Sequence, residues 1–177
     1  MEIHKYEKIW LAASFVLILA LIATVTYGTV AVGVKMIDKS GTIKPSQVSE
    51  HPKFGDPGVR KTGKNTYDVY VVARRFAFQP GTNQPIRLPE GSKVTFHVTS
   101  PDVIHGFEVV GTNVNTMVIP GQVSVVTAYF NETDTYGLVC NEYCGSGHHY
   151  MAGKIEVLPR SEYNVTAMTV STKGGDA

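Results

Sequence analysis

The segment CNEYCGSGHHYM, residues 140–151, gathers four side chains that can bind a soft metal ion. Cys140 and Cys144 are the only two cysteines of the 177-residue chain, and His148 and Met151 follow them closely. Thiolate, imidazole and thioether groups favour copper, whereas carboxylate and carbonyl oxygens favour magnesium, calcium or manganese. The segment therefore predicts a copper site.

A mononuclear blue-copper site needs one cysteine, two histidines and a weak axial methionine. The second histidine must come from elsewhere, and His105 in SPDVIHGF stands in a predicted loop between two strands. His97 lies on the polar face of its strand, where we expect a solvated surface residue, and His149 should project away from a loop that presents His148. The extra cysteine suggests two metals, because two thiolates can bridge a copper pair and leave one imidazole for each ion.

The alternative interpretation of Cys140 and Cys144 is a structural disulfide, the usual state of paired cysteines outside the cytoplasm. A disulfide would leave His148 and Met151 without a role, so the metal site explains more of the segment.

The N-terminal part of the chain predicts a membrane anchor. No charged residue occurs from Ile9 to Val34, and about 26 residues at ~1.5 Å each would reach ~39 Å, more than the ~30 Å hydrocarbon core. A cleaved signal peptide is the alternative, but its apolar region is typically only about 7–15 residues. Trp10 and Tyr27 suit the two membrane interfaces, whereas the charges flanking the span give no clear orientation.

The rest of the chain predicts a mainly β domain. We divide the sequence into an anchor (1–35), an irregular connector rich in Pro, Gly and Ser (36–66), a folded domain (67–158) and a flexible tail (159–177). Short apolar or alternating runs indicate strands at Tyr67–Ala73, Lys93–Thr99, Phe107–Val110, Val123–Phe130 and Lys154–Leu158. Many short strands separated by turn residues favour a β-sandwich or barrel. The formal net charge of +1 shows no basic excess of the kind that nucleic-acid binding requires.

The cysteine segment closely resembles the binuclear copper (CuA) loop of cytochrome c oxidase subunit II, C-x-E-x-C-x-x-x-H-x-x-M. The SPDVIHGF segment is similar to that family's upstream histidine motif, and KYEKIWLAASF with a single span resembles the B-family oxidases. This resemblance implies a cupredoxin-like Greek-key β-barrel tethered by one N-terminal transmembrane helix.

The resemblance also implies a ligand set. Cys140 and Cys144 would bridge both coppers, with His105 and Met151 on one ion. His148 and the backbone carbonyl of Glu142 would bind the other ion.

The function implied is that of the subunit through which electrons enter a haem–copper terminal oxidase. Electrons would come from a cytochrome c or a small copper protein and pass to haem in the catalytic subunit I, where oxygen is reduced. The copper domain would lie on the periplasmic or outer face of the cell membrane, with the N-terminus inside. No segment of the sequence resembles a catalytic triad or a haem-attachment motif, so the chain itself would be an electron relay.

Two other classes of protein contain similar residues and give alternative functions. A copper-containing nitric oxide reductase can use the same domain as its electron-accepting subunit. A membrane-tethered copper chaperone can use C-x-x-x-C with a distant histidine, but its thioredoxin-like fold needs an α/β alternation that this sequence does not show.

An aromatic stretch, ARRFAFQP at residues 73–80, departs from the family pattern. Many members carry tryptophans there, where electrons arrive from the donor, whereas this chain has Phe76 and Phe78. We expect either that these rings form an aromatic edge for incoming electrons or that they are alternating core residues of a strand.

Overall fold

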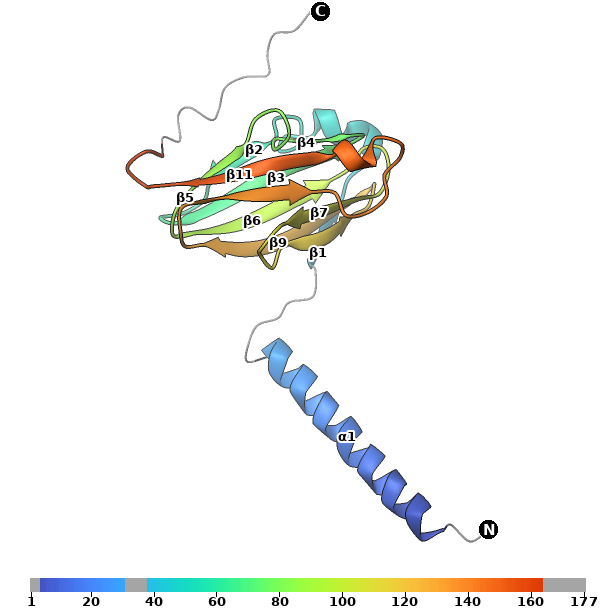
Figure 1. Ribbon diagram of the computed structural model, residues 1–177. Coiled ribbons are helices and arrows are strands. Elements are labelled where there is room, and N and C mark those ends of the chain that lie inside the picture. Colours follow the sequence, from blue (N-terminus) through green and yellow to red (C-terminus); the bar gives the residue numbers. More distant parts are fainter. Residues whose placement is uncertain (1–3, 31–37, 164–177) are drawn as a thin grey trace, which may run out of the picture. The chain divides into compact units, whose positions relative to one another are not determined.

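The computed structural model describes residues 4–30 and 38–163, which belong to two separate units divided after residue 36 (Figure 1). The first unit contains helix α1 (Lys5–Val30), which buries none of its side chains within the protein. Its length and apolar composition are sufficient to cross a membrane. Thr24 and Thr26 donate their hydroxyls to the carbonyls of Ala20 and Ile22, at 2.6 and 2.7 Å, so these polar groups are satisfied within the helix.

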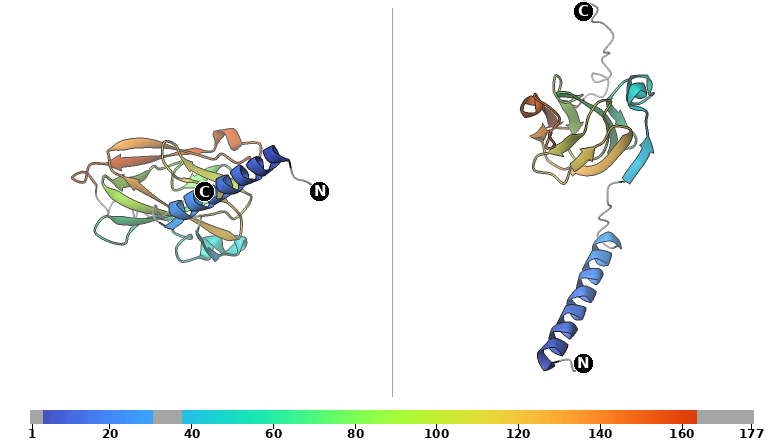
Figure 2. Two further views of the ribbon diagram at one scale, coloured as in Figure 1. Left: turned by 90° about the horizontal axis from the view of Figure 1, so that it is seen from below. Right: turned by 90° about the vertical axis from the view of Figure 1, so that its right-hand side faces the viewer.

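The second unit consists of two β-sheets that curl around a common core (Figure 2). One sheet has the strand order β1-β9-β6-β3-β2, with β4 added beside β3, and the other has the order β5-β11-β10-β7-β8. The strands are β1 (Asp38–Thr42), β2 (Gly58–Lys61), β3 (Thr66–Arg74), β4 (Ala77–Gln79), β5 (Ile86–Pro89), β6 (Ser92–Thr99), β7 (His105–Val109), β8 (Asn115–Val118), β9 (Gln122–Phe130), β10 (Asp134–Val139) and β11 (Ala152–Leu158). Two short 3-10 helices, η1 (Pro45–Glu50) and η2 (His148–Tyr150), interrupt the loops.

The core between the sheets is built from alternating residues, as the sequence predicted for Lys93–Thr99. Val94, Phe96 and Val98 of β6 are fully buried. Phe96 contacts Phe107 of β7, whose ring meets Phe78 of β4 edge-on with ring centroids 5.6 Å apart. Each of the five predicted strands is present within a few residues of its expected bounds.

The face of the first sheet that points away from the core is only partly exposed to solvent, because residues 43–54 cover part of it. Ile43, Val48 and Phe54 form a second buried cluster with Tyr70, Val72 and Val123. This corrects the interpretation of residues 36–66 as an irregular connector: β1 pairs with β9, β2 pairs with β3, and η1 lies between them in sequence. Residues 36 and 37 of that range lie outside the described residues.

His97 also differs from the solvated residue that we expected. Its ring stacks on Tyr70 with centroids 4.7 Å apart, and its Nε2 lies 3.6 Å from an Asp68 carboxylate oxygen. Desolvation by burial lowers the pKa of His97, so the fold disfavours the protonated ring.

The beginning of the predicted tail packs on the domain. Arg160 donates to the side chain of Asn65 and to the carbonyl of Gly91, at 2.9 and 3.0 Å. Tyr163 meets Tyr67 edge-on with ring centroids 5.9 Å apart. The flexible tail predicted from residue 159 is therefore wrong for residues 159–163, and residues 164–177 lie outside the described part of the chain.

Candidate metal centre

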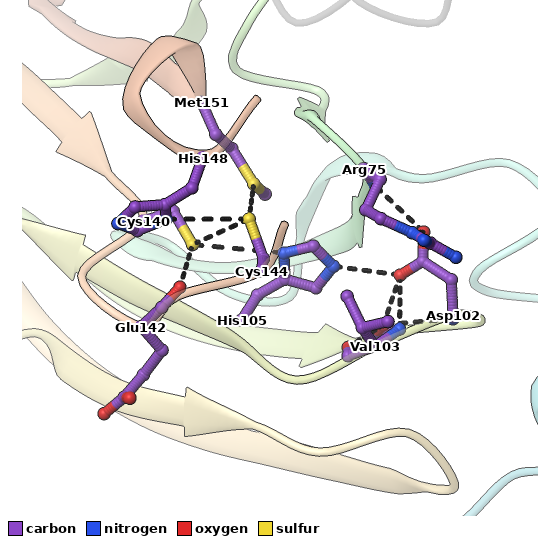
Figure 3. A network of polar contacts seen from close by, with 10 residues as sticks. Arg75, Asp102, Val103, His105, Cys140, Glu142, Cys144, His148 and Met151 are labelled. Atoms are coloured by element: carbon purple, nitrogen blue, oxygen red, sulfur yellow. Dashed lines mark hydrogen bonds and ion pairs between the residues drawn. The ribbon is translucent and has the colours of Figure 1, made fainter. Parts of the chain in front are cut away.

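The predicted ligands meet at one end of the second sheet because its strands begin and end there (Figure 3). His105 is the first residue of β7, and Cys140 follows the last residue of β10. The loop after β10 continues through Cys144 into η2, and Met151 directly precedes β11. The Cys140 amide donates to the Met151 carbonyl at 3.2 Å, which closes the base of the loop.

Six donor atoms converge within this loop and the start of β7. The Sγ atoms of Cys140 and Cys144 lie 3.8 Å apart. Around Cys140 Sγ, His105 Nδ1 lies at 3.9 Å and the Glu142 carbonyl oxygen at 3.2 Å. Around Cys144 Sγ, His148 Nδ1 lies at 3.6 Å and Met151 Sδ at 3.7 Å. Two sulfurs therefore form the centre of the cluster, and the other donors surround them.

The two cysteines are free thiols, which removes the disulfide interpretation. Their sulfurs are separated by 3.8 Å, whereas a disulfide bond is about 2.05 Å long. Burial, followed by the contact with Cys140, raises the pKa of the Cys144 thiol to about 11. A metal ion that binds here must therefore displace the thiol proton, as thiolate coordination requires.

Asp102 orients the ring of His105. Its Oδ1 lies 2.9 Å from His105 Nε2, and an ionised carboxylate can only accept hydrogen bonds, so Nε2 carries the proton and Nδ1 faces the sulfurs with a free lone pair. Partial burial alone would raise the pKa of Asp102, but hydrogen bonds from His105, the Arg75 and Val103 amides and Ser100 outweigh it and lower that pKa to about 2.

Phe76 and Phe78 occupy different environments. Phe76 is half-buried and packs on the ligand loop, where a Cβ added at Gly147 would lie 2.7 Å from Phe76 Cε2. Gly145 adopts a φ of 130°, a conformation that glycine allows, and a Cβ there would lie 3.2 Å from the same ring. Phe78 is buried against Phe107 in the core. Because glycine has no Cβ at these two positions, the loop can pack closely against the Phe76 ring.

The outer side of the loop is open to solvent. His148 is half-buried and its ring meets that of Tyr143 edge-on, with centroids 5.8 Å apart. Tyr143 and Tyr150 are among the most exposed aromatic side chains of the domain. His149 is exposed and packs against Tyr150 instead of the sulfurs, with ring centroids 3.9 Å apart.

Sequence reasoning missed the residues that support the donors. Asp102 stands three positions before His105, and a carboxylate so close to a candidate ligand is a signal that could have identified it. Arg75 adds a 3.8 Å ion pair to the same carboxylate. Asn141 contacts a neighbouring strand through its side chain, and no feature of the sequence indicates this.

The donor chemistry fits copper. Two thiolates, two imidazole nitrogens, a thioether and a carbonyl oxygen are a soft to borderline set, and a thioether in particular is a copper ligand rather than a zinc or magnesium ligand. His105, Cys140 and Cys144 are buried, with potential ligand atoms within 4.8 Å of one another.

Comparisons with known proteins agree with this chemistry. Residues 65–158 match the family described as cytochrome C oxidase subunit II, periplasmic domain. Cytochrome c oxidase subunit 2 of Thermus thermophilus is 44% identical over 159 residues, which cover 88% of this chain and 93% of the relative. A probable cytochrome c oxidase subunit 2 of Streptomyces avermitilis is 34% identical over 113 residues, or 62% of this chain and 35% of the relative.

Solved structures show the same fold. A chain in the cryo-EM structure of a heme-copper terminal oxidase dimer is 32% identical and superposes with a TM-score of 0.73, covering 87% of this chain and 100% of that one. The periplasmic domain of subunit II of cytochrome oxidase from Bradyrhizobium japonicum gives a TM-score of 0.50 at 19% identity, covering 58% of this chain and 89% of that one. These likenesses confirm the predicted cupredoxin-like fold.

Proposed function

Because this chain belongs to the cytochrome c oxidase subunit II family, we propose that it is the subunit through which electrons enter a haem–copper terminal oxidase, and that it holds a binuclear copper centre. The observation that carries this proposal is the pair of buried, unbonded cysteine sulfurs 3.8 Å apart, with an imidazole nitrogen beside each. One thiolate and two imidazoles would suffice for a single copper ion, so the second thiolate supports a pair.

The proposed ligands divide between two ions. Cys140 and Cys144 would contribute thiolates to both ions, His105 and Met151 would complete one site, and His148 with the Glu142 carbonyl would complete the other. Bound copper would supply one-electron redox chemistry at this position. The chain itself would fix the positions of the metal-binding atoms, because His105 begins β7, Cys140 follows β10 and Met151 precedes β11. Donors fixed by a sheet move little when the charge of the centre changes, which favours fast electron transfer.

Membership of this family supports the partners that we propose. Helix α1 and the match to a periplasmic domain fit a single-pass membrane protein. We place the copper domain on the outer face of the cell membrane, beside a haem-containing subunit I. The electron donor would be a cytochrome c or a small copper protein.

Of the two phenylalanines, Phe76 is the better candidate for an electron-receiving edge, since it is half-buried and packs on the ligand loop, whereas Phe78 is buried in the core.

The alternative functions are less well supported. The copper chaperone would need a thioredoxin-like α/β fold, whereas strands joined by loops and short 3-10 helices make up residues 38–163. No observation on this chain favours nitric oxide as the terminal acceptor.

The test is to purify the full chain, load it with copper, and record its copper content and electron paramagnetic resonance spectrum. We expect two coppers per chain and a hyperfine pattern from one unpaired electron shared by two copper nuclei. A single copper with an ordinary mononuclear spectrum would overturn the proposal. Comparing oxygen and nitric oxide consumption by the purified complex would then distinguish the oxidase from the reductase.

A further inference from the structure

Asn141 lies between two proposed donors, the Cys140 thiol and the Glu142 carbonyl, but its own side chain points to neither. Its Nδ2 donates one hydrogen bond to Glu108 Oε2 and one to Asn115 Oδ1, both at 3.0 Å. A side-chain amide has two N–H groups, so both are used. Glu108 of β7 and Asn115 of β8 are direct cross-strand partners, and Asn141 therefore joins both strands of the β7–β8 hairpin.

These contacts begin where the backbone pairing of β10 with β7 stops. The last pair of that ladder is Val139 with Glu108. Continuing the same register would place Asn141 opposite Gly106, and the two residues are in close contact there: a Cβ added at Gly106 would lie 2.7 Å from the Asn141 backbone nitrogen and would also collide with the Asn141 side chain. Gly106 is thus a position at which close approach of the loop requires glycine.

The contacts of Asn141 connect the ligand loop to the strand that carries the remaining histidine. Gly106 directly follows His105, and Glu108 lies two positions further along β7. On the loop side, the Cys140 sulfur and the Glu142 carbonyl lie 3.2 Å apart, on either side of Asn141 in sequence. Asn141 therefore links the Cys140–Glu142 segment to the strand that begins with His105.

We propose that Asn141 is a positioning residue of the metal centre, which fixes the Cys140 sulfur and the Glu142 carbonyl against β7 through Glu108, Asn115 and Gly106. This inference rests on the proposed copper site, but it concerns a residue that binds no metal. Groups that orient ligands from outside typically change metal affinity or activity by roughly 10–100-fold when they are removed. Since Asn141 is exposed and its hydrogen bonds compete with water, we expect an effect of roughly tenfold, at the lower end of that range.

The experiment compares Asn141→Ala, Glu108→Gln and Asn113→Ala in the full chain. Asn113 is a matched control, because it too is exposed and donates one hydrogen bond from the same hairpin, to the Thr127 carbonyl at 3.1 Å, away from the ligand loop. Glu108→Gln keeps an acceptor oxygen for Asn141 and removes only the charge. For each variant we would measure copper content, the hyperfine pattern, the reduction potential and the rate of electron transfer.

We expect Asn141→Ala to keep two coppers, with an altered hyperfine pattern, a shifted potential and roughly tenfold slower electron transfer. Glu108→Gln and Asn113→Ala should resemble the unsubstituted chain. In the metal-free chain, amide hydrogen exchange in residues 140–144 should be faster for Asn141→Ala than for Asn113→Ala, because the loop has lost its attachment to the hairpin.

Two results would overturn the inference while leaving the proposed function intact. One is a wild-type potential and hyperfine pattern in Asn141→Ala. The other is an equal change in Asn113→Ala, which would mean that any loss of hairpin stability has this effect. If the unsubstituted chain shows no signal from two coupled coppers, the proposed function itself fails and the inference fails with it.

Discussion

Asp102 Oδ1 lies 2.9 Å from His105 Nε2, and this contact determines which nitrogen of the ring faces the cysteine sulfurs. The same carboxylate accepts hydrogen bonds from the backbone amides of Arg75 and Val103, at 2.8 and 2.7 Å. Asp102 is thereby fixed by two segments of the chain, and it fixes His105 in turn.

Removing this carboxylate should weaken the metal centre. In Asp102→Ala the ring of His105 loses its orienting partner, and we expect copper affinity to fall roughly 10–100-fold. Asp102→Asn retains an acceptor oxygen and similar size, so its loss should be smaller. Competition with a chelator of known copper affinity measures both variants. Unchanged affinity in Asp102→Ala would mean that the ring is held by packing alone.

Cys144 and Met151 should respond unequally to substitution, because in the proposed site the Cys144 thiolate would hold both metals whereas the Met151 thioether would be a weak ligand that mainly adjusts the potential. Cys144→Ser should leave at most one copper with an altered spectrum. Met151→Leu keeps similar volume and apolarity, and should retain two coppers with a shifted potential and slower electron transfer. Copper content, spectrum and potential are measured side by side. If Cys144→Ser keeps two coupled coppers, Cys144 does not bridge; if Met151→Leu equals the wild type in all three, Met151 is not a ligand.

The segment before β3 should be necessary for a stable domain. A chain that begins at residue 37 retains β1, η1 and β2, and we expect a soluble β-domain that binds copper. A chain that begins at residue 65 loses Ile43, Val48 and Phe54, and burying each such side chain contributes about 1.5–3 kcal/mol. It would also expose Tyr70, Val72 and Val123. Urea unfolding and light scattering compare the two chains, and equal stability would show that residues 37–64 are dispensable.

The contact of Tyr163 with Tyr67 should be visible in the alkaline stability of the domain. Burial raises the pKa of Tyr163 to about 12, whereas a tyrosine in the unfolded chain ionises near pH 10. Between about pH 10 and 12 the unfolded chain has lost a proton that the folded chain keeps, so stability is fully present below that window and falls as pH rises through it.

Tyr163→Phe cannot ionise, so its free energy of unfolding should fall less steeply between about pH 10 and 12. Denaturant unfolding at several pH values in this window measures the slope, with Tyr129→Phe, an exposed tyrosine on β9, as the control. The same slope in Tyr163→Phe and the wild type would indicate that residue 163 does not pack on the domain in solution.

The residues that we propose as ligands could be singled out from the sequence because most of them lie in one short segment of unusual composition. Cys140, Cys144, His148 and Met151 have side chains whose shared preference is for copper. His105 was expected in a loop between two predicted strands, and in the structure it is the first residue of β7. Strands such as β6 were visible through their alternation of apolar and polar residues. Local chemistry and local periodicity were sufficient for these features.

Features that depend on long-range pairing were not predictable in this way. Ile43, Val48 and Phe54 follow neither a helical nor a strand period, so the sequence gives no sign that they cover a sheet. Strands β4, β5 and β8 have only three to four residues each, too few to show a pattern. The contacts of Asn141 depend on the register between β10 and β7, which no local pattern determines.

The parallel pairing of β5 with β11 also affects the order in which parts of the domain can fold. β11 is the last strand among the described residues, and it is bound on its two sides by β10 and by β5 from much earlier in the chain. Synthesis proceeds from the N-terminus, and pairings distant in sequence form slowly. Residues 140–151, which lead into β11, therefore gain their fixed arrangement only after β11 itself has been made. Insertion of copper into the proposed site would accordingly follow the synthesis of β11, because a chain that ends before β11 has the two cysteines without the sheet that holds them in place.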